Sequence, residues 1–255
     1  MTSLLPAIGF LLAAAFATGP RPPDVALYQQ VLQAYVQEDG LVRYAALRRD
    51  IAGLDEFVRQ VAPVSPRSHP ELFPSRESKL AYWINAYNAL VLWAFAKDYP
   101  EKKGRLQGLL GRGVFFYRMK FTVGGERRSL ASIENEIIRK EFREPRIHFA
   151  LVCASSSCPK LSRQAYTEKN LETLLETETR RFLNEPRNVA IDATRRVITL
   201  SKLFDWYKED FGRTQREMLD FLARYRESDR SSLSENGWRI QHFEYDWSPN
   251  AATER

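Results

Sequence analysis

A short segment around one of the three histidines holds the residue types in this chain that are best suited to chemistry. His148 stands near the start of the apolar run 147–152, and Cys153 follows that run directly. Small residues then lead to Cys158 and a proline. An imidazole beside a thiol lowers the pKa of the thiol and serves as its general base. The segment therefore predicts a thiol nucleophile, Cys153 or Cys158, with His148 as the base.

The same two cysteines, the only ones in the sequence, support other interpretations. An even number of cysteines in an exported protein first suggests a disulfide, which would leave no thiol nucleophile until it is reduced. His148 would then be a structural histidine. A metal site built from His148, Cys153 and Cys158 is a third interpretation, but the spacing matches no usual zinc pattern. We predict no metal, and the redox state of the sulfurs stays open.

Polar residues elsewhere could support this chemistry. Asn85 and Asn88 are three residues apart in an otherwise apolar segment, so they share one face of a helix. Buried amides need partners: these two could hold the tautomer of His148, donate to an oxyanion or cap neighbouring loops. Glu134 lies between core-type residues and would orient His148 if it points inward. We therefore add Asn85 and Glu134 to the candidate catalytic residues, with the backbone amides of residues 154–157 as oxyanion donors.

Aromatic side chains gather in segments 82–90 and 200–211, and again at 245–247. Plain core packing is one interpretation of these clusters. The other is a cleft wall that contacts a peptide, a glycan or a small thiol compound. The candidate ligand-binding residues are Trp83, Tyr87, Asn88, Trp206 and Tyr207.

Helices predicted from apolar periodicity must position these residues. The segment from about residue 77 to 98 is apolar on nearly every face, which is typical of a helix buried in the middle of a fold. The other predicted helices cover residues 25–35, 44–61, 129–142, 171–183, 203–211 and 217–225.

Strand patterns are shorter and fewer. Residues 147–152 predict a central strand with His148 near its start, and residues 238–247 alternate as a final strand. Strand and hairpin material is predicted at 114–117 and 120–123, with Gly124–Gly125, and a hairpin at 189–200. The sequence thus predicts an α+β fold in a single domain, with a small, mostly antiparallel sheet and packed helices.

The first 17 residues predict a secretory signal peptide. Residues 4–17 are apolar and end in Ala15-Phe16-Ala17, although no lysine or arginine precedes them. The run is short for a membrane span, which needs about 20 apolar residues. We expect a periplasmic or secreted protein without a stable membrane span after signal removal. A Pro-rich spacer at 18–24, one domain at 25–250 and a tail at 251–255 complete the organisation.

Composition narrows the function classes further. The chain has 255 residues and a net charge of +6, with lysines and arginines spread along its length. Nucleic-acid binding needs a clustered basic face and a recognisable motif. The sequence also contains no phosphate loop and no cofactor fingerprint. We therefore predict no nucleic-acid partner and no cofactor.

An ordered set of these motifs resembles the DUF547 family of unknown function. The resemblance rests on residues 35–44, 82–90, 129–134, 148–159, 200–211 and 245–247, and so extends over nearly all of 25–250. The family is similar in pattern to papain-like and transglutaminase-like folds, which place a cysteine at the start of a buried helix and a histidine on a later strand. This chain departs from that order: its buried helix has Asn85 and Asn88, and its cysteines follow the histidine.

The resemblance implies no particular activity, so three functions remain in view. The first is a binding module on a cysteine-hydrolase-like scaffold, with an unnamed small molecule or peptide as ligand. The second is a thiol-dependent hydrolase or acyltransferase that uses Cys153 or Cys158 with His148. The third is a structural envelope protein with a purely packed core.

Overall fold

The structure is a computed structural model that describes residues 19–98 and 114–253. The predicted signal peptide at 1–17 lies outside the described residues. Within the described ranges, the chain forms no helix with the length and apolar character needed to cross a membrane.

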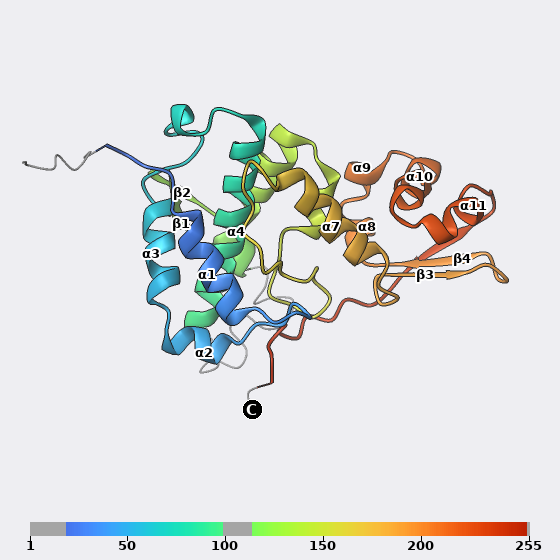
Figure 1. Cartoon of the computed structure of the whole chain (residues 1–255). Helices are drawn as coiled ribbons and strands as arrows, with labels where there is room; N and C mark the ends of the chain where they lie inside the picture. Colours follow the sequence, from blue (N-terminus) through green and yellow to red (C-terminus); the bar gives the residue numbers. More distant parts are fainter. Residues whose placement is uncertain (1–18, 99–113, 254–255) are drawn as a thin grey trace, which may run out of the picture.

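Helices of the N-terminal third pack around one long central helix. These are α1 (Val25–Tyr35), α2 (Tyr44–Arg49), α3 (Ala52–Val61) and the central helix α4 (Arg76–Asp98). In Figure 1, α1 and α3 lie on one side of α4, with α2 at its lower end. Buried residues such as Leu80, Ile84 and Val91 follow α4 without a polar face, as predicted for a core helix. The predicted helix at 44–61 is instead two helices, α2 and α3, separated at Asp50 and Ile51.

A 3₁₀ turn precedes α4, and the segment from residue 114 to 142 holds a hairpin and two π-helical elements. The elements are η1 (Pro70–Leu72, before α4), η2 (Val114–Arg118), β1 (Phe121–Val123), β2 (Glu126–Arg128), α6 (Leu130–Ser132) and η3 (Ile133–Phe142). The antiparallel β1–β2 hairpin turns at Gly124–Gly125; β1 lies in the predicted strand at 120–123, whereas β2 was not predicted. The strand predicted at 114–117 is wrong, because those residues form the π-helical turn η2. The helix predicted at 129–142 is present, but most of it is π-helical.

The predicted central strand at 147–152 is absent, and His148 lies instead in the 3₁₀ helix η4 (Pro145–Phe149). Pro145 occupies the first turn of η4, where its missing N–H costs nothing, and the Glu144 side chain caps the turn by accepting from the Arg146 N–H. The backbone that follows has no strand partner. The side-chain amide of Asn88 takes the place of a strand partner: it donates to the carbonyl of Ala150 and accepts from the N–H of Val152.

The C-terminal third adds a three-stranded sheet covered by short helices. Strands β3 (Val189–Asp192) and β4 (Val197–Leu200) pair antiparallel as predicted, and β5 (Arg239–His242) pairs parallel to β4. The final strand therefore ends at His242, five residues earlier than predicted. The helices are α7 (Leu171–Leu183), α8 (Leu203–Trp206), α9 (Lys208–Phe211), α10 (Gln215–Tyr225), η5 (Glu227–Asp229) and α11 (Arg230–Leu233).

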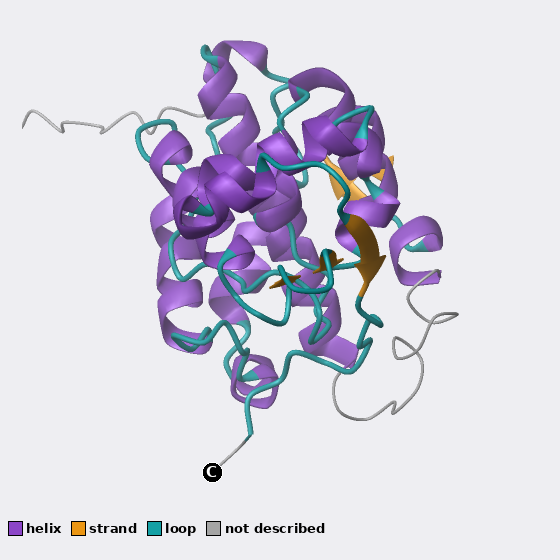
Figure 2. Ribbon diagram, turned by 90° about the vertical axis from the view of Figure 1, so that its right-hand side faces the viewer, coloured by secondary structure: helices purple, strands orange, loops and turns teal. Residues whose placement is uncertain are grey.

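Buried apolar residues form two clusters. The larger cluster surrounds α4 and includes residues of α1–α3 and η3. The smaller cluster contains Phe149, Phe182 and residues of β3, β4, α8–α11. Figure 1 shows the sheet and α10–α11 extending to one side of the α1–α4 body, and Figure 2 shows short strands among many helices. The fold is a single α+β domain with small, mostly antiparallel sheets, as predicted.

Candidate functional site

A cavity of about 500 Å³ lies where the two clusters meet. Its wall is formed by the turn η2, helix α4, the α6–η3 segment, the η4 turn with the loop after it, helix α8 and the C-terminal segment. We call it the site cavity. Its lining includes Tyr87, Ala131, Glu134, Arg139, His148, Cys153, Cys158, Trp206, Tyr207, Tyr245 and Trp247. Residues from six separate segments of the chain therefore share one hollow.

His148 reaches this cavity as half of a histidine–carboxylate pair. Its Nε2 atom lies 2.6 Å from Oδ2 of Asp210, and the imidazole is almost fully buried. Arg139 donates to the same carboxylate through Nε at 2.6 Å and Nη2 at 3.1 Å. Partial burial raises the pKa of Asp210, but hydrogen bonds from His148 and Arg139 outweigh it and lower that pKa to about 2. Asp210 is therefore ionised at neutral pH and fixes one imidazole nitrogen.

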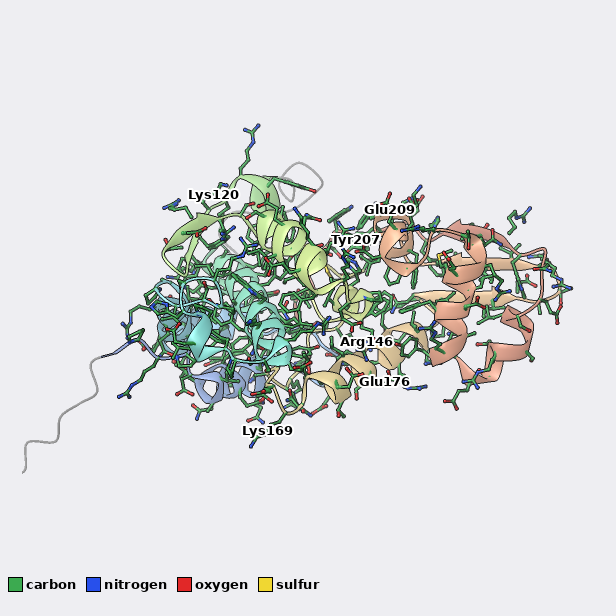
Figure 3. The ribbon with its side chains drawn as sticks, turned by 90° about the horizontal axis from the view of Figure 1, so that it is seen from above. Lys120, Arg146, Lys169, Glu176, Tyr207 and Glu209 are labelled. Atoms are coloured by element: carbon green, nitrogen blue, oxygen red, sulfur yellow. A yellow bond between two sulfur atoms is a disulfide. The ribbon has the colours of Figure 1, made fainter. Side chains whose placement is uncertain are left out.

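Aromatic rings fix the other sides of the imidazole. The Tyr207 ring stacks on it with centroids 4.0 Å apart, and the Phe211 ring lies 5.4 Å away. The guanidinium carbon of Arg139 lies 4.9 Å from the Tyr207 ring centroid, within cation–π range. In Figure 3, Tyr207 lies at the junction between the α1–α4 body and the part that holds α9 and α10. The stack joins η3, η4 and the α8–α9 turn.

Glu134 is a second carboxylate in the wall, and it is also buried. The hydroxyl of Tyr87 donates to its Oε2 at 2.9 Å. Burial raises the pKa of the Tyr207 phenol, and the nearby Glu134 charge raises it further. Hydrogen bonds in a π-helix join residues five apart, so the π-helix η3 brings Glu134 and Arg139 onto one side. Both side chains then line the cavity.

Cys153 and Cys158 are joined as a disulfide, and both line the cavity. Of the alternatives left open by the sequence, the structure thus contains the disulfide and no free thiol among the described residues. The loop they enclose is clamped by the C-terminal segment: the Ser156 N–H donates to Ser248 O at 2.7 Å and the Ser157 N–H to Asp246 O at 3.2 Å. These two amides were predicted as oxyanion donors; that prediction is wrong for both, because they are already bonded.

Part of the chain, including much of the site cavity, matches a known protein family. The model of the family described as "Protein of unknown function, DUF547" matches residues 72–183. The chain carries a DUF547 domain. The matched segment contains Glu134, His148 and both cysteines of the site cavity. Neither a curated protein nor a solved structure matches the chain, so the predicted likeness to papain-like folds has no support from a neighbour.

The two asparagines of the DUF547 domain hold backbone rather than the imidazole. The Nδ2 atom of Asn85 donates to the carbonyl of Tyr166 at 2.6 Å, and its Oδ1 atom accepts from the Tyr166 N–H at 2.9 Å. Asn85 does not line the site cavity. Asn88 bonds the main chain just before Cys153. The orienting contact to His148, predicted for Asn85 or Glu134, is made by Asp210.

The predicted aromatic residues divide between core and cavity. Trp83 is buried in the larger cluster against Tyr82, outside the site cavity. Tyr87, Trp206 and Tyr207 line the cavity as a cleft wall would require. Trp206 also contacts Tyr245 and Trp247, with ring centroids 4.7 and 5.6 Å apart.

Asp210 and Arg139 are members of the site that were not predicted from the sequence. Asp210 lies three residues after Tyr207 in a segment that was singled out only for its aromatic residues. The sequence signal that could have identified Asp210 is its spacing of about one helical turn from Tyr207, a predicted site residue. Arg139 gave no such signal, because a period of 3.6 residues does not align it with Glu134.

Proposed function

We propose that the DUF547 domain binds a small organic ligand in the site cavity. The observation that carries the proposal is the cavity itself, a hollow of about 500 Å³ walled by aromatic rings with a few fixed polar groups. Ligand sites in proteins are typically hollows of about 300–1,000 Å³ with this mixture of lining.

The polar groups of the wall support the proposal because neighbours hold them in place. Asp210 and Tyr207 fix His148, and Tyr87 fixes Glu134. A ligand that contacts these groups would not have to order them first, which reduces the entropic cost of binding. The exposed faces of Tyr117 and Trp206, 68% and 43% exposed, offer apolar surface at the mouth.

A neutral fluorescent probe, N-phenyl-1-naphthylamine, tests the proposal. Its emission rises when it enters an apolar site. We expect saturable binding to the native protein and at least a fivefold weaker affinity in Ala131→Phe, because Ala131 lines the cavity and a phenyl ring there fills it. The matched control is Ala34→Phe, at an exposed position of α1.

Circular dichroism of both variants checks that the fold is kept. Equal probe affinity in Ala131→Phe and Ala34→Phe, with both folded, would refute binding in the site cavity. Absence of any saturable signal from the native protein would also refute it.

A thiol-dependent hydrolase is the second candidate. It is favoured by His148, which pairs with Asp210 and lines the same cavity as two sulfurs. It ranks second because neither sulfur is a thiol while the disulfide is closed. After reduction with dithiothreitol, this candidate predicts iodoacetamide labelling of Cys153 that slows at least tenfold in His148→Ala. Equal labelling rates in a folded variant count against it.

We also propose that the protein is exported. The proposal is supported by the apolar N-terminal segment that ends in Ala15-Phe16-Ala17 and by a disulfide, which persists in oxidising compartments. Mass spectrometry of the protein purified from its own cells tests it. A chain that starts near Thr18 supports export, and an intact chain recovered only from the cytoplasm contradicts it.

A further inference from the structure

We propose that the Cys153–Cys158 disulfide is a redox-active pair that undergoes exchange with a low-molecular-weight thiol in the site cavity. This goes beyond ligand binding, because the disulfide would be chemically changed rather than serve as part of the wall. The inference rests on hydrogen-bond donors already placed around both sulfurs.

The buried sulfur is the better leaving group. Cys158 is 4% exposed, and its Sγ accepts from the Cys153 N–H at 2.9 Å and from the Tyr245 O–H at 3.3 Å. When the disulfide breaks, negative charge develops on the departing sulfur. Donors already aimed at that atom stabilise the thiolate, as they do for other low-pKa thiols.

The other sulfur is the point of attack. Cys153 is partly exposed, and it lines the cavity. Its Sγ lies 2.8 Å from Ser155 Oγ and 3.1 Å from Tyr245 Oη, and these two oxygens lie 3.0 Å from each other. The hydroxyl proton of Ser155 can therefore turn toward Cys153 once it becomes a thiolate, and the single proton of Tyr245 can serve either sulfur in turn.

The loop does not depend on the disulfide for its position. Ser156 and Ser157 are bonded to the C-terminal segment through their N–H groups, and the Arg187 guanidinium donates to Ser156 O at 2.5 Å. On the other side, Asn88 holds the N–H of Val152. These contacts keep the two sulfurs near each other after reduction, which favours reversible closure over permanent opening.

The exchange is balanced with two equivalents of thiol. A thiolate RS⁻ attacks Sγ of Cys153 and forms a mixed disulfide; the Sγ–Sγ bond breaks and its electron pair stays on Cys158. A second thiolate attacks the sulfur that carries R in the mixed disulfide; the bond to Cys153 Sγ breaks, RSSR leaves and the electron pair stays on Cys153 as a thiolate. The protein disulfide is reduced by two electrons, the two thiols are oxidised to RSSR, and the protein thiolates take up the two protons.

Glutathione is the probe for the test. The folded protein is equilibrated with defined ratios of reduced to oxidised glutathione, quenched with acid and alkylated with a maleimide for mass counting. We expect two-electron reduction at a measurable midpoint while the circular dichroism stays native. In Cys158→Ser, we expect a glutathione adduct on Cys153. A disulfide that resists every ratio, and dithiothreitol as well, until urea unfolds the chain would overturn the proposal.

Tyr245→Phe tests the role of the phenol as a positioning residue. Loss of its donor should disfavour the dithiol about tenfold at equilibrium, a shift of about 30 mV to more negative potential. Tyr117→Phe, which changes another tyrosine of the same cavity, should leave the midpoint unchanged. If Tyr245→Phe does not fold, Ser155→Ala serves in its place, with a shift in the same direction. An unshifted midpoint in the folded variant contradicts the assignment, whether or not the cavity binds N-phenyl-1-naphthylamine.

Discussion

His148 and Asp210 are 62 positions apart in the sequence, yet Nε2 of one lies 2.6 Å from Oδ2 of the other. Asp210 is part of α9, which packs in the smaller apolar cluster. Arg139, which binds the same carboxylate, is part of η3, which packs in the larger cluster. The carboxylate therefore links the two apolar clusters through Arg139 and His148, which both line the site cavity.

Asp210 makes stability sensitive to acid. Its pKa is about 2 in the folded protein against an ordinary value of 3.8, so the ionised form stabilises the fold. That contribution, about 2 kcal/mol, is complete above about pH 4 and is lost as the pH falls toward 2. Urea unfolding at several pH values should show this loss in the native protein but not in Asp210→Asn. Asp220→Asn, at a more exposed carboxylate, should keep the native slope. Parallel pH slopes in the native protein and Asp210→Asn would contradict the pairing.

Asn88 should be more important for stability than an exposed asparagine. Asn88→Ala leaves a buried carbonyl of Ala150 and a buried N–H of Val152 without partners, at a cost of about 2–4 kcal/mol. Asn236→Ala, at an exposed position, should change the free energy of unfolding by less than about 0.5 kcal/mol. Chemical denaturation of both variants measures the difference, and equal stabilities would show that the backbone bonds of Asn88 are not formed.

Arg139 should not tolerate lysine. A lysine keeps the charge but loses the two-point bond to Asp210 and the planar contact with Tyr207. We expect Arg139→Lys to lose about 1–2 kcal/mol of stability and to weaken the binding of N-phenyl-1-naphthylamine. Arg59→Lys, in an exposed pair with Glu56, is the control and should behave as the native protein. A variant as stable as this control would argue against the bidentate contact.

Buried tyrosines should resist alkaline titration. Burial raises the pKa of Tyr28, Tyr87, Tyr166 and Tyr207, so the folded state keeps their protons. Stability from these groups is present below the unfolded pKa of about 10 and decreases as the pH rises above it. Absorbance near 295 nm should show fewer than the chain's 11 tyrosines ionising before the circular dichroism changes. Ionisation of all of them in a native fold would show that these rings are accessible to water.

Local patterns were sufficient to predict much of the fold. Helices α1 and α7 and the β3–β4 hairpin have the predicted bounds, because amphipathic spacing and turn residues are local signals. The strand predicted at 147–152 failed because a short apolar run is equally compatible with a buried turn. What decides between them is Asn88, about 60 residues earlier, whose amide takes the hydrogen bonds that a neighbouring strand would have made.

The candidate site was predicted only in part. His148, both cysteines, Glu134, Tyr87, Trp206 and Tyr207 do share one cavity. The role of Asp210 depends on a contact between distant segments, and that of Arg139 on a π-helical period, and neither can be derived from spacing in one sequence. Asn85 and Trp83 share the polar and aromatic character of the site residues, but they lie elsewhere in the core.

Proton NMR of the three histidines tests ligand binding beside His148 most directly. Variants His69→Gln and His242→Gln assign the imidazole signals and leave that of His148 by elimination. We predict that N-phenyl-1-naphthylamine shifts the His148 signal saturably and leaves those of His69 and His242 in place. An unmoved His148 signal in a sample that binds the probe would contradict the account.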